Sequence, residues 1–287
     1  MKKLIHVIFV LVVISIHLGG CASEETAPPP PAPTLIAGHY TYDDLVRTFD
    51  YDPQESLDIQ EVSVSDEEAG VEVHDISYAG TLDYRVPAYL VVPPGEGPFA
   101  GVLFMHQGFG SRNSFLNEAI SLAEKGVVSL LVHHGSWKAV PDNYKQIVVS
   151  LRRGADLLEL REDIDSSRLA YVGHSWGATF GGILADVDKR FQTYILIAGV
   201  PSFSEIWERK DLVPFDGIHY IGQAAPAPLL FQLANQDEYV SRDTALLFYE
   251  AASEPKQVNW YDTTHFFKHE EAQQDRLEWL SRELKLP

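Results

Sequence analysis

Continuous hydrophobic runs alternate with amphipathic stretches over most of the chain. Between the runs, apolar residues recur every three or four positions, which is the period of a helix with one buried face. Buried strands that alternate with such helices predict an α/β fold, with a mostly parallel sheet of about eight strands and helices on both faces. The apolar runs typical of strands buried on both faces cover residues 100–106, 127–133, 169–173, 194–198 and 228–233.

Two segments before the first apolar run follow a different period. Residues 71–78 and 86–93 alternate apolar and polar positions, as half-exposed strands do, and predict an antiparallel hairpin. Residues 38–69 mix aromatic and acidic residues without a clear period, and we expect an N-terminal arm packed on the domain. Residues 199–227 carry aromatic residues among charges, which favours a small lid or pocket wall. We therefore expect a single domain over residues 38–287.

The first 20 residues resemble a secretion signal. Two lysines precede an apolar run from Leu4 to Leu18, which is shorter than the ~20 residues that cross a membrane. The run ends just before Cys21 in a sequence that resembles a bacterial lipobox, which implies lipidation of this cysteine. We expect a Pro-rich tether over residues 21–37 and a lipid anchor that holds the protein to a membrane of the bacterial cell envelope. Ordinary cleavage near Ala22, giving a soluble secreted or periplasmic protein, is the alternative.

Charge and cysteine content exclude several classes of function. The net charge of −19 argues against nucleic acids and other polyanions as partners. Cys21 is the only cysteine in the chain, so neither a cysteine nucleophile nor a cysteine-ligated zinc is available, and no disulfide can form within the chain. We expect neither a cofactor nor a metal.

A short motif after the third apolar run carries candidate chemistry. Gly-His-Ser-Trp-Gly at residues 173–177 joins a predicted strand to a helix that is rich in small residues. A strand, a sharp turn and a helix form an elbow that strains the backbone at Ser175 and lifts its hydroxyl clear of the sheet. This motif resembles the nucleophile elbow of the α/β-hydrolase family, which implies that Ser175 is the catalytic nucleophile.

The resemblance also implies an acid and then a histidine after the nucleophile. Asp237 and His265 each follow a predicted buried strand, at the edge of the sheet where Ser175 emerges. The histidine would take the serine proton, and the carboxylate would fix its tautomer. Glu238 competes with Asp237 as the acid, and His269 competes with His265 as the base. The two histidines also have the spacing of metal ligands on a helix, although no third ligand stands out nearby.

A second loop supplies candidate oxyanion donors. The intermediate of acyl transfer needs two donors aimed at its oxygen, and the backbone N–H of Trp176 is the first. The His-Gln-Gly-Phe-Gly loop at residues 106–110 resembles the family's His-Gly oxyanion loop with Gln107 inserted. This implies Phe109 as the second donor, with Gly108 as the open alternative. Gly108, Phe109 and Trp176 are also expected to line the substrate pocket.

The resemblance to the family covers roughly residues 70–287. The loop at 106–110, the Leu-Arg-Arg-Gly-Ala-Asp-Leu-Leu sequence at 151–158 and the motif at 173–177 are most similar to the dienelactone-hydrolase-like branch. Dienelactone hydrolases proper carry a cysteine nucleophile, so Ser175 is a departure from them. The resemblance implies a serine hydrolase that cleaves small-molecule carboxylic esters through an acyl-enzyme on Ser175. A thioesterase or peptidase with the same triad, and a non-catalytic envelope lipoprotein with the same fold, are the alternatives.

Overall fold

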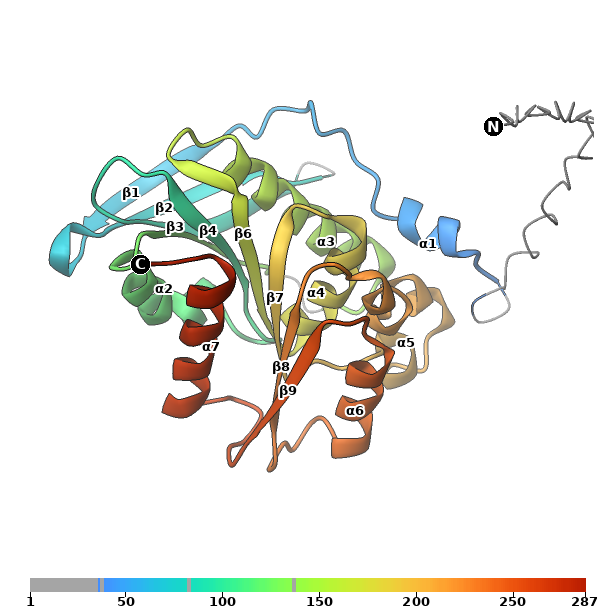
Figure 1. Cartoon of the computed structure of the whole chain (residues 1–287). Helices are drawn as coiled ribbons and strands as arrows, with labels where there is room; N and C mark the ends of the chain where they lie inside the picture. Colours follow the sequence, from blue (N-terminus) through green and yellow to red (C-terminus); the bar gives the residue numbers. More distant parts are fainter. Residues whose placement is uncertain (1–35, 37–38, 82–83, 136–137) are drawn as a thin grey trace, which may run out of the picture. The chain divides into compact units, whose positions relative to one another are not determined.

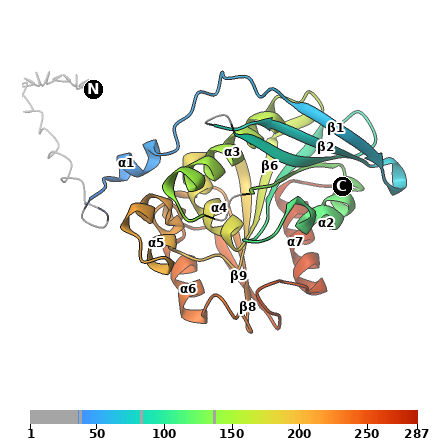
Figure 2. The same cartoon turned by 180° about the vertical axis from the view of Figure 1, so that it is seen from behind.

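A single sheet organises the chain, with helices packed on both of its faces (Figures 1 and 2). The computed structural model describes residues 36, 39–81, 84–135 and 138–287, which fall in one compact unit. The expected signal peptide, Cys21 and nearly all of the expected tether therefore lie outside the described residues. The strands are β1 (Gln60–Asp66), β2 (Glu72–Ala79), β3 (Arg85–Val92), β4 (Phe99–Met105), β5 (Val127–Val132), β6 (Ile164–His174), β7 (Phe191–Ile197), β8 (Leu229–Ala234) and β9 (Lys256–Tyr261).

The strands lie in the order β1-β2-β3-β5-β4-β6-β7-β8-β9. The six strands from β5 to β9 in this order are parallel, which confirms the predicted fold class. The predicted hairpin is confirmed as the antiparallel pair β2 and β3, and β3 joins the parallel part by pairing antiparallel with β5. The edge strand β1 adds a ninth strand to the predicted eight. Its only apolar alternation is Val62-Ser63-Val64-Ser65, and all seven of its residues are exposed.

The helices divide between two hydrophobic clusters. Buried residues of α3, α4 and α6 belong to one cluster, and those of α2 and α7 belong to the other, on the opposite face of the sheet (Figures 1 and 2). Helices on both faces are thus confirmed. The α-helices are α1 (Tyr42–Arg47), α2 (Leu116–Ala123), α3 (Pro141–Glu159), α4 (Trp176–Val187), α5 (Phe203–Ile206), α6 (Arg242–Ala251) and α7 (Glu270–Glu283). Short 3-10 turns cover Glu68–Gly70, Arg112–Phe115, Lys210–Phe215, Gly217–His219 and Ile221–Gln223.

The described part of the 38–69 segment contributes three side chains to the core, Leu45, Phe49 and Leu57. Leu45 in α1 and Phe49 just after it are fully buried. The Phe49 ring packs edge-on against Phe215 at 5.8 Å and against Tyr220 at 5.9 Å. These contacts attach the beginning of the described chain to the segment that follows β7.

Residues 199–227 form α5 and three 3-10 turns beside α3 and α4. Phe203 of α5 is buried, and its ring lies 4.7 Å from Tyr144 of α3 and 5.5 Å from Trp176 at the start of α4. Trp207 remains 45% exposed. A role for this segment as a lid stays a prediction, but its packing brings Phe203 next to the turn that carries Ser175.

Candidate active site

The turn between β6 and α4 has the geometry of a strained elbow. Ser175 adopts φ 54° and ψ −111°, a left-handed backbone conformation that is rare for residues with a side chain. Its N–H donates a 2.7 Å hydrogen bond to the carbonyl of Ile197, which holds the strained residue against β7. This hydrogen bond fixes the backbone of the residue that carries the hydroxyl.

Two glycines let α4 approach the sheet closely enough to form this turn. A methyl group on Gly173 would overlap the backbone of Gly177, and one on Gly177 would overlap the carbonyl of Met105 in β4. The Tyr171 hydroxyl donates a 2.7 Å hydrogen bond to the Gly177 carbonyl and so ties the first turn of α4 to β6. The predicted strand–turn–helix elbow thus rests on close backbone contacts that only glycine permits.

Ser175, His265 and Asp237 form one hydrogen-bonded chain. The Ser175 hydroxyl oxygen lies 2.8 Å from Nε2 of His265, and Nδ1 of His265 lies 2.8 Å from one carboxylate oxygen of Asp237. His265 comes from the loop after β9 and Asp237 from the loop after β8. All three side chains are largely buried, with 7% and 4% of the His265 and Asp237 side chains exposed. The structure therefore brings together the three residues that the sequence singles out.

Hydrogen bonds keep Asp237 in its charged form. Burial acts to raise the pKa of this carboxyl, but hydrogen bonds from His265 and from the backbone N–H groups of Val240 and Tyr239 outweigh burial and lower the pKa below its ordinary value. A carboxylate that faces Nδ1 requires the proton of neutral His265 to be on Nδ1. Nε2 is then an acceptor, directed at the Ser175 hydroxyl.

Glu238 and His269, the competitors of Asp237 and His265, make other contacts. The Glu238 carboxylate accepts a 3.1 Å hydrogen bond from the backbone N–H of His265 and not from its ring. His269 lies at the start of α7, with its ring 5.6 Å from the ring of Tyr261. The Ser175 hydroxyl is bonded to His265, so the geometry favours Asp237 and His265 over their neighbours.

His174, which precedes the serine, also contacts the His265 backbone. Its Nε2 lies 2.6 Å from the His265 carbonyl oxygen, so Nε2–H is the donor. Burial, with a smaller contribution from neighbouring His265, lowers the pKa of His174 to about 3, so this ring is neutral near pH 7. Both polar groups of the His265 backbone are thus held, the N–H by Glu238 and the C=O by His174. The sequence gives no signal for these contacts, because they join residues 27 and 91 positions apart.

The loop after β4 lies against the Ser175 turn. A 3.0 Å hydrogen bond from the Gly110 N–H to the Gln107 carbonyl closes a tight turn, in which Phe109 has a φ of 58°. A methyl group on Gly108 would come within 3.3 Å of the Trp176 indole. The two segments expected to supply oxyanion donors are therefore neighbours, with Gly108 packed on Trp176.

His106 is hydrogen-bonded to this turn through its side chain. Nδ1–H of His106 donates a 2.7 Å hydrogen bond to the Gln107 carbonyl, and Nε2 of His106 accepts from the backbone N–H of His134 at 3.3 Å. Burial, with smaller contributions from His133 and His134, lowers the pKa of His106 to about 4. Neutral His106 thus bridges the ends of β4 and β5 beneath the expected oxyanion loop.

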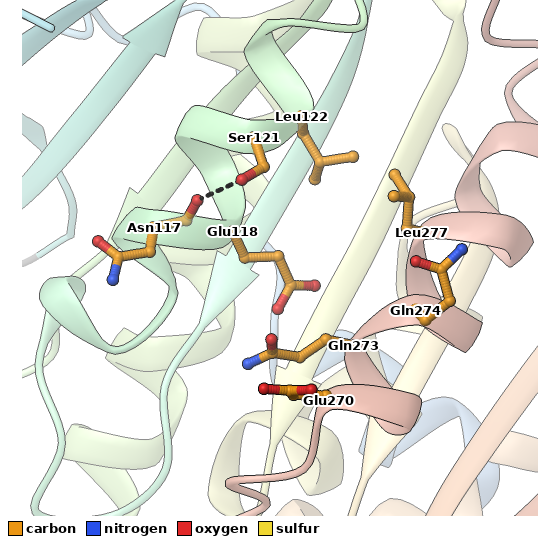
Figure 3. A pocket seen from close by; sticks show the side chains of 8 residues that line it. All are labelled: Asn117, Glu118, Ser121, Leu122, Glu270, Gln273, Gln274 and Leu277. Carbon is orange, nitrogen blue, oxygen red and sulfur yellow. Dashed lines mark hydrogen bonds between the residues drawn. The ribbon is translucent and has the colours of Figure 1, made fainter. Parts of the chain in front are cut away.

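The described residues contain two cavities on the α2 and α7 side of the sheet. One of about 260 Å³ is lined in part by Gln107, His174 and Phe266. A second, of about 340 Å³, lies between α2 and α7, where Glu118 and Gln273 point toward each other (Figure 3). No group of three or more potential metal ligands occurs among the residues that the structure describes.

Comparisons with known proteins agree with this architecture. An acetyl xylan esterase from Paenibacillus sp. R4 superposes with a TM-score of 0.72 at 20% identity, over 84% of this chain and 93% of that one. A Klebsiella pneumoniae protein assigned as a dienelactone hydrolase superposes with a TM-score of 0.59 at 18% identity, over 79% and 98%. This protein has the α/β-hydrolase fold. Within that fold, Ser175 occupies the elbow between a central parallel strand and the following helix.

Sequence comparison finds a likeness over part of the chain. Esterase EstD of Thermotoga maritima is 24% identical over 136 residues, which are 43% of this α/β-hydrolase-fold chain and 32% of that esterase. The chain thus matches about a third of the length of this relative. No protein-family model matches the sequence.

Proposed function

We propose that this protein is a serine hydrolase that cleaves carboxylic esters through an acyl-enzyme on Ser175. The observation that carries the proposal is the hydrogen-bonded chain from the Ser175 hydroxyl through His265 to Asp237, in which both nitrogens of the histidine are 2.8 Å from a partner. The similarity to proteins named as esterases supports ester hydrolysis in general.

The geometry defines a role for each member of the triad. His265 Nε2 takes the proton of the Ser175 hydroxyl as the oxygen attacks the ester carbonyl, and Asp237 stabilises the imidazolium that forms. His265 then gives this proton to the leaving alcohol oxygen, and the acyl group stays on Ser175. In the second half of the reaction, His265 takes a proton from the water that attacks the acyl-enzyme, and returns this proton to the Ser175 oxygen as the acid is released.

Backbone N–H groups would stabilise the oxyanion of each tetrahedral intermediate. The N–H of Trp176, at the start of α4, and the N–H of Phe109, in the neighbouring turn, are the proposed donors, with Gly108 as the alternative to Phe109. The contact between Gly108 and Trp176 supports this pairing, because it brings the two donor segments together. We propose that Gly108, Phe109 and Trp176 also line the acyl side of the pocket.

Ester turnover tests the proposal. We expect the purified protein to hydrolyse at least one of p-nitrophenyl acetate, butyrate and octanoate, and Ser175→Ala to lower kcat by a factor on the order of 10⁴ or more. The matched control is Ser121→Ala, which removes an exposed hydroxyl bonded only to its own helix and is expected to retain the wild-type rate. Hydrolysis of acyl thioesters in preference to all three esters would favour the thioesterase alternative. A folded protein without Ser175-dependent turnover would favour the non-catalytic one.

We further propose that lipidation of Cys21 anchors the protein to a membrane of the bacterial cell envelope. Support comes from the lipobox-like sequence that ends at this residue. Among the described residues, no helix has the length and apolar character to cross a membrane. Mass spectrometry of the N-terminal peptide is expected to find a diacylglyceryl group on Cys21, and Cys21→Ser is expected to move the protein from the membrane fraction to the soluble one. An unmodified N-terminus near Ala22 would support ordinary cleavage instead.

A further inference from the structure

Two exposed aromatic rings pack against the proposed catalytic base. Tyr239 is 69% exposed and Phe266 is 50% exposed, although both are large apolar side chains. The Tyr239 ring lies 5.0 Å from the His265 ring, and the Phe266 ring lies 6.2 Å from both, perpendicular to Tyr239. Each ring follows a member of the triad closely in the chain, Tyr239 after Asp237 and Phe266 after His265. We call these two rings the aromatic pair.

The backbone that carries the aromatic pair is well anchored. The N–H of Tyr239 donates a 2.9 Å hydrogen bond to the Asp237 carboxylate. Beyond Phe266, the buried side chain of Phe267 and a 3.1 Å hydrogen bond from its N–H to the Thr264 carbonyl fix the loop. The rings are therefore presented to solvent by ordered loops. Adjacent exposed apolar surfaces of this kind mark binding sites more often than isolated exposed residues do.

The contact with His265 puts the aromatic pair beside the alcohol part of a bound ester. The base must reach the leaving oxygen, because the proton taken from Ser175 passes to that oxygen when the alcohol departs. The alcohol part of the substrate therefore leaves beside Nε2 of His265. Side chains packed on the His265 ring border the alcohol, whereas the donors at Phe109 and Trp176 border the carbonyl and acyl group.

We propose that the alcohol part of the preferred ester contains a ring with a flat apolar face, which packs on Tyr239 and Phe266. This inference rests on the proposed ester hydrolysis and extends it to a class of substrate. Flat faces of this kind occur in phenols, through the aromatic ring, and in pyranosides, through axial C–H groups. A short linear alkyl alcohol has no such face and gains little from the aromatic pair.

The test compares three acetates that share one acyl group: ethyl acetate, phenyl acetate and a methyl pyranoside monoacetate. Wild type, Tyr239→Ala and Phe266→Ala are compared by kcat/KM on each substrate, so that the intrinsic reactivity of each ester cancels. Loss of one ring is expected to lower kcat/KM for a ring-bearing acetate by about 2- to 12-fold and to change it less than about 2-fold for ethyl acetate. Tyr239→Phe keeps the ring and is expected to retain wild-type selectivity. Leu160→Ala, at an exposed apolar residue after α3, is the control for loss of apolar surface.

The outcomes separate this inference from the proposed function. A selective loss for phenyl acetate alone assigns a phenolic alcohol, and a selective loss for the pyranoside alone assigns a sugar alcohol. An equal loss on all three acetates, or no loss on any, overturns the inference while Ser175-dependent turnover of ethyl acetate still supports the hydrolase. If wild type hydrolyses no ester, both the function and the inference fail.

Discussion

Nε2 of His174 donates a 2.6 Å hydrogen bond to the carbonyl oxygen of His265, across 91 positions of the chain. The residue before the proposed nucleophile thus holds the backbone of the proposed base. Glu238, which follows the proposed acid, holds the N–H of the same residue at 3.1 Å. His265 is therefore fixed at its ring and at both backbone groups by residues that belong to, or adjoin, the other two members of the triad.

Loss of the His174 donor is expected to impair turnover more than substrate binding. His174→Ala leaves a buried carbonyl without its partner, which costs about 1–3 kcal/mol of stability, and frees the His265 loop to shift. We expect kcat to fall roughly 10- to 100-fold with KM nearly unchanged, because small displacements of a catalytic group have effects of this size. His174→Gln retains an N–H donor and is expected to restore part of kcat. An unchanged kcat in a folded His174→Ala protein would show that the bond has no part in positioning the base.

Asp237 and Glu238 form a matched pair for assigning the acid. Asp237→Asn removes the charge that faces Nδ1 of His265 and is expected to lower kcat about 10³- to 10⁴-fold. Glu238→Gln retains an oxygen that can accept from the His265 N–H, so kcat is expected to fall by less than about 10-fold. Steady-state kinetics of the two variants on one ester shows which carboxylate is the acid. A larger fall of kcat in Glu238→Gln than in Asp237→Asn would make Glu238 the acid.

Acid is expected to destabilise the protein through His174. A histidine in the unfolded chain titrates near pH 6.5, whereas burial lowers the pKa of His174 to about 3 in the folded state. Between these values the unfolded state binds one more proton than the folded state, so the free energy of unfolding falls as the pH falls, by about 1.4 kcal/mol per pH unit for this group.

Urea unfolding between pH 6.5 and 4 measures this slope in wild type and in His174→Gln. We expect the slope to be smaller in the variant, because glutamine does not titrate. His106, whose pKa burial lowers to about 4, is expected to contribute a slope of the same sign that remains in the variant. Equal slopes in the two proteins would mean that His174 is charged in the folded state.

Gly177, two residues after Ser175, is expected to contribute strongly to stability. A methyl group on Gly177 would overlap the carbonyl of Met105, which belongs to the backbone of β4 and cannot move aside as a flexible side chain could. Gly177→Ala is therefore expected to lower the free energy of unfolding by about 3 kcal/mol or more. The control is Gly135→Ala, where the nearest atom to an added methyl group is 3.8 Å away. Similar thermal unfolding of the two variants would contradict the close packing of α4 on β4.

The central part of the fold is predictable because its signals are local. Continuous apolar runs identify the parallel strands, and small residues around Ser175 identify the elbow. The edge strand β1 has no continuous apolar run, and its two alternating valines, Val62 and Val64, are exposed and not packed on the core. The placement of β5 between β3 and β4 is also invisible in the sequence, because crossovers decide strand order and local periodicity does not.

In the candidate site, too, the sequence predicts some features and not others. Ser175, Asp237 and His265 are predictable from a motif and from strand ends. The choice between Asp237 and Glu238 depends on which carboxylate faces the ring and which faces the backbone, and adjacent residues of similar chemistry give no sequence signal for that. The contacts of His174, Tyr239 and Phe266 with His265 depend on how separate loops meet at one edge of the sheet.

The reactivity of Ser175 is the most direct test of the proposed triad. The purified protein is treated with a fluorophosphonate, which reacts with serines activated by a neighbouring base, and the modified peptide is identified by mass spectrometry. We predict a single adduct on Ser175 in wild type, its absence in Ser175→Ala, and much slower labelling in His265→Ala. A folded wild-type protein that does not react, or that reacts at another serine, would contradict the role of Ser175 as the nucleophile.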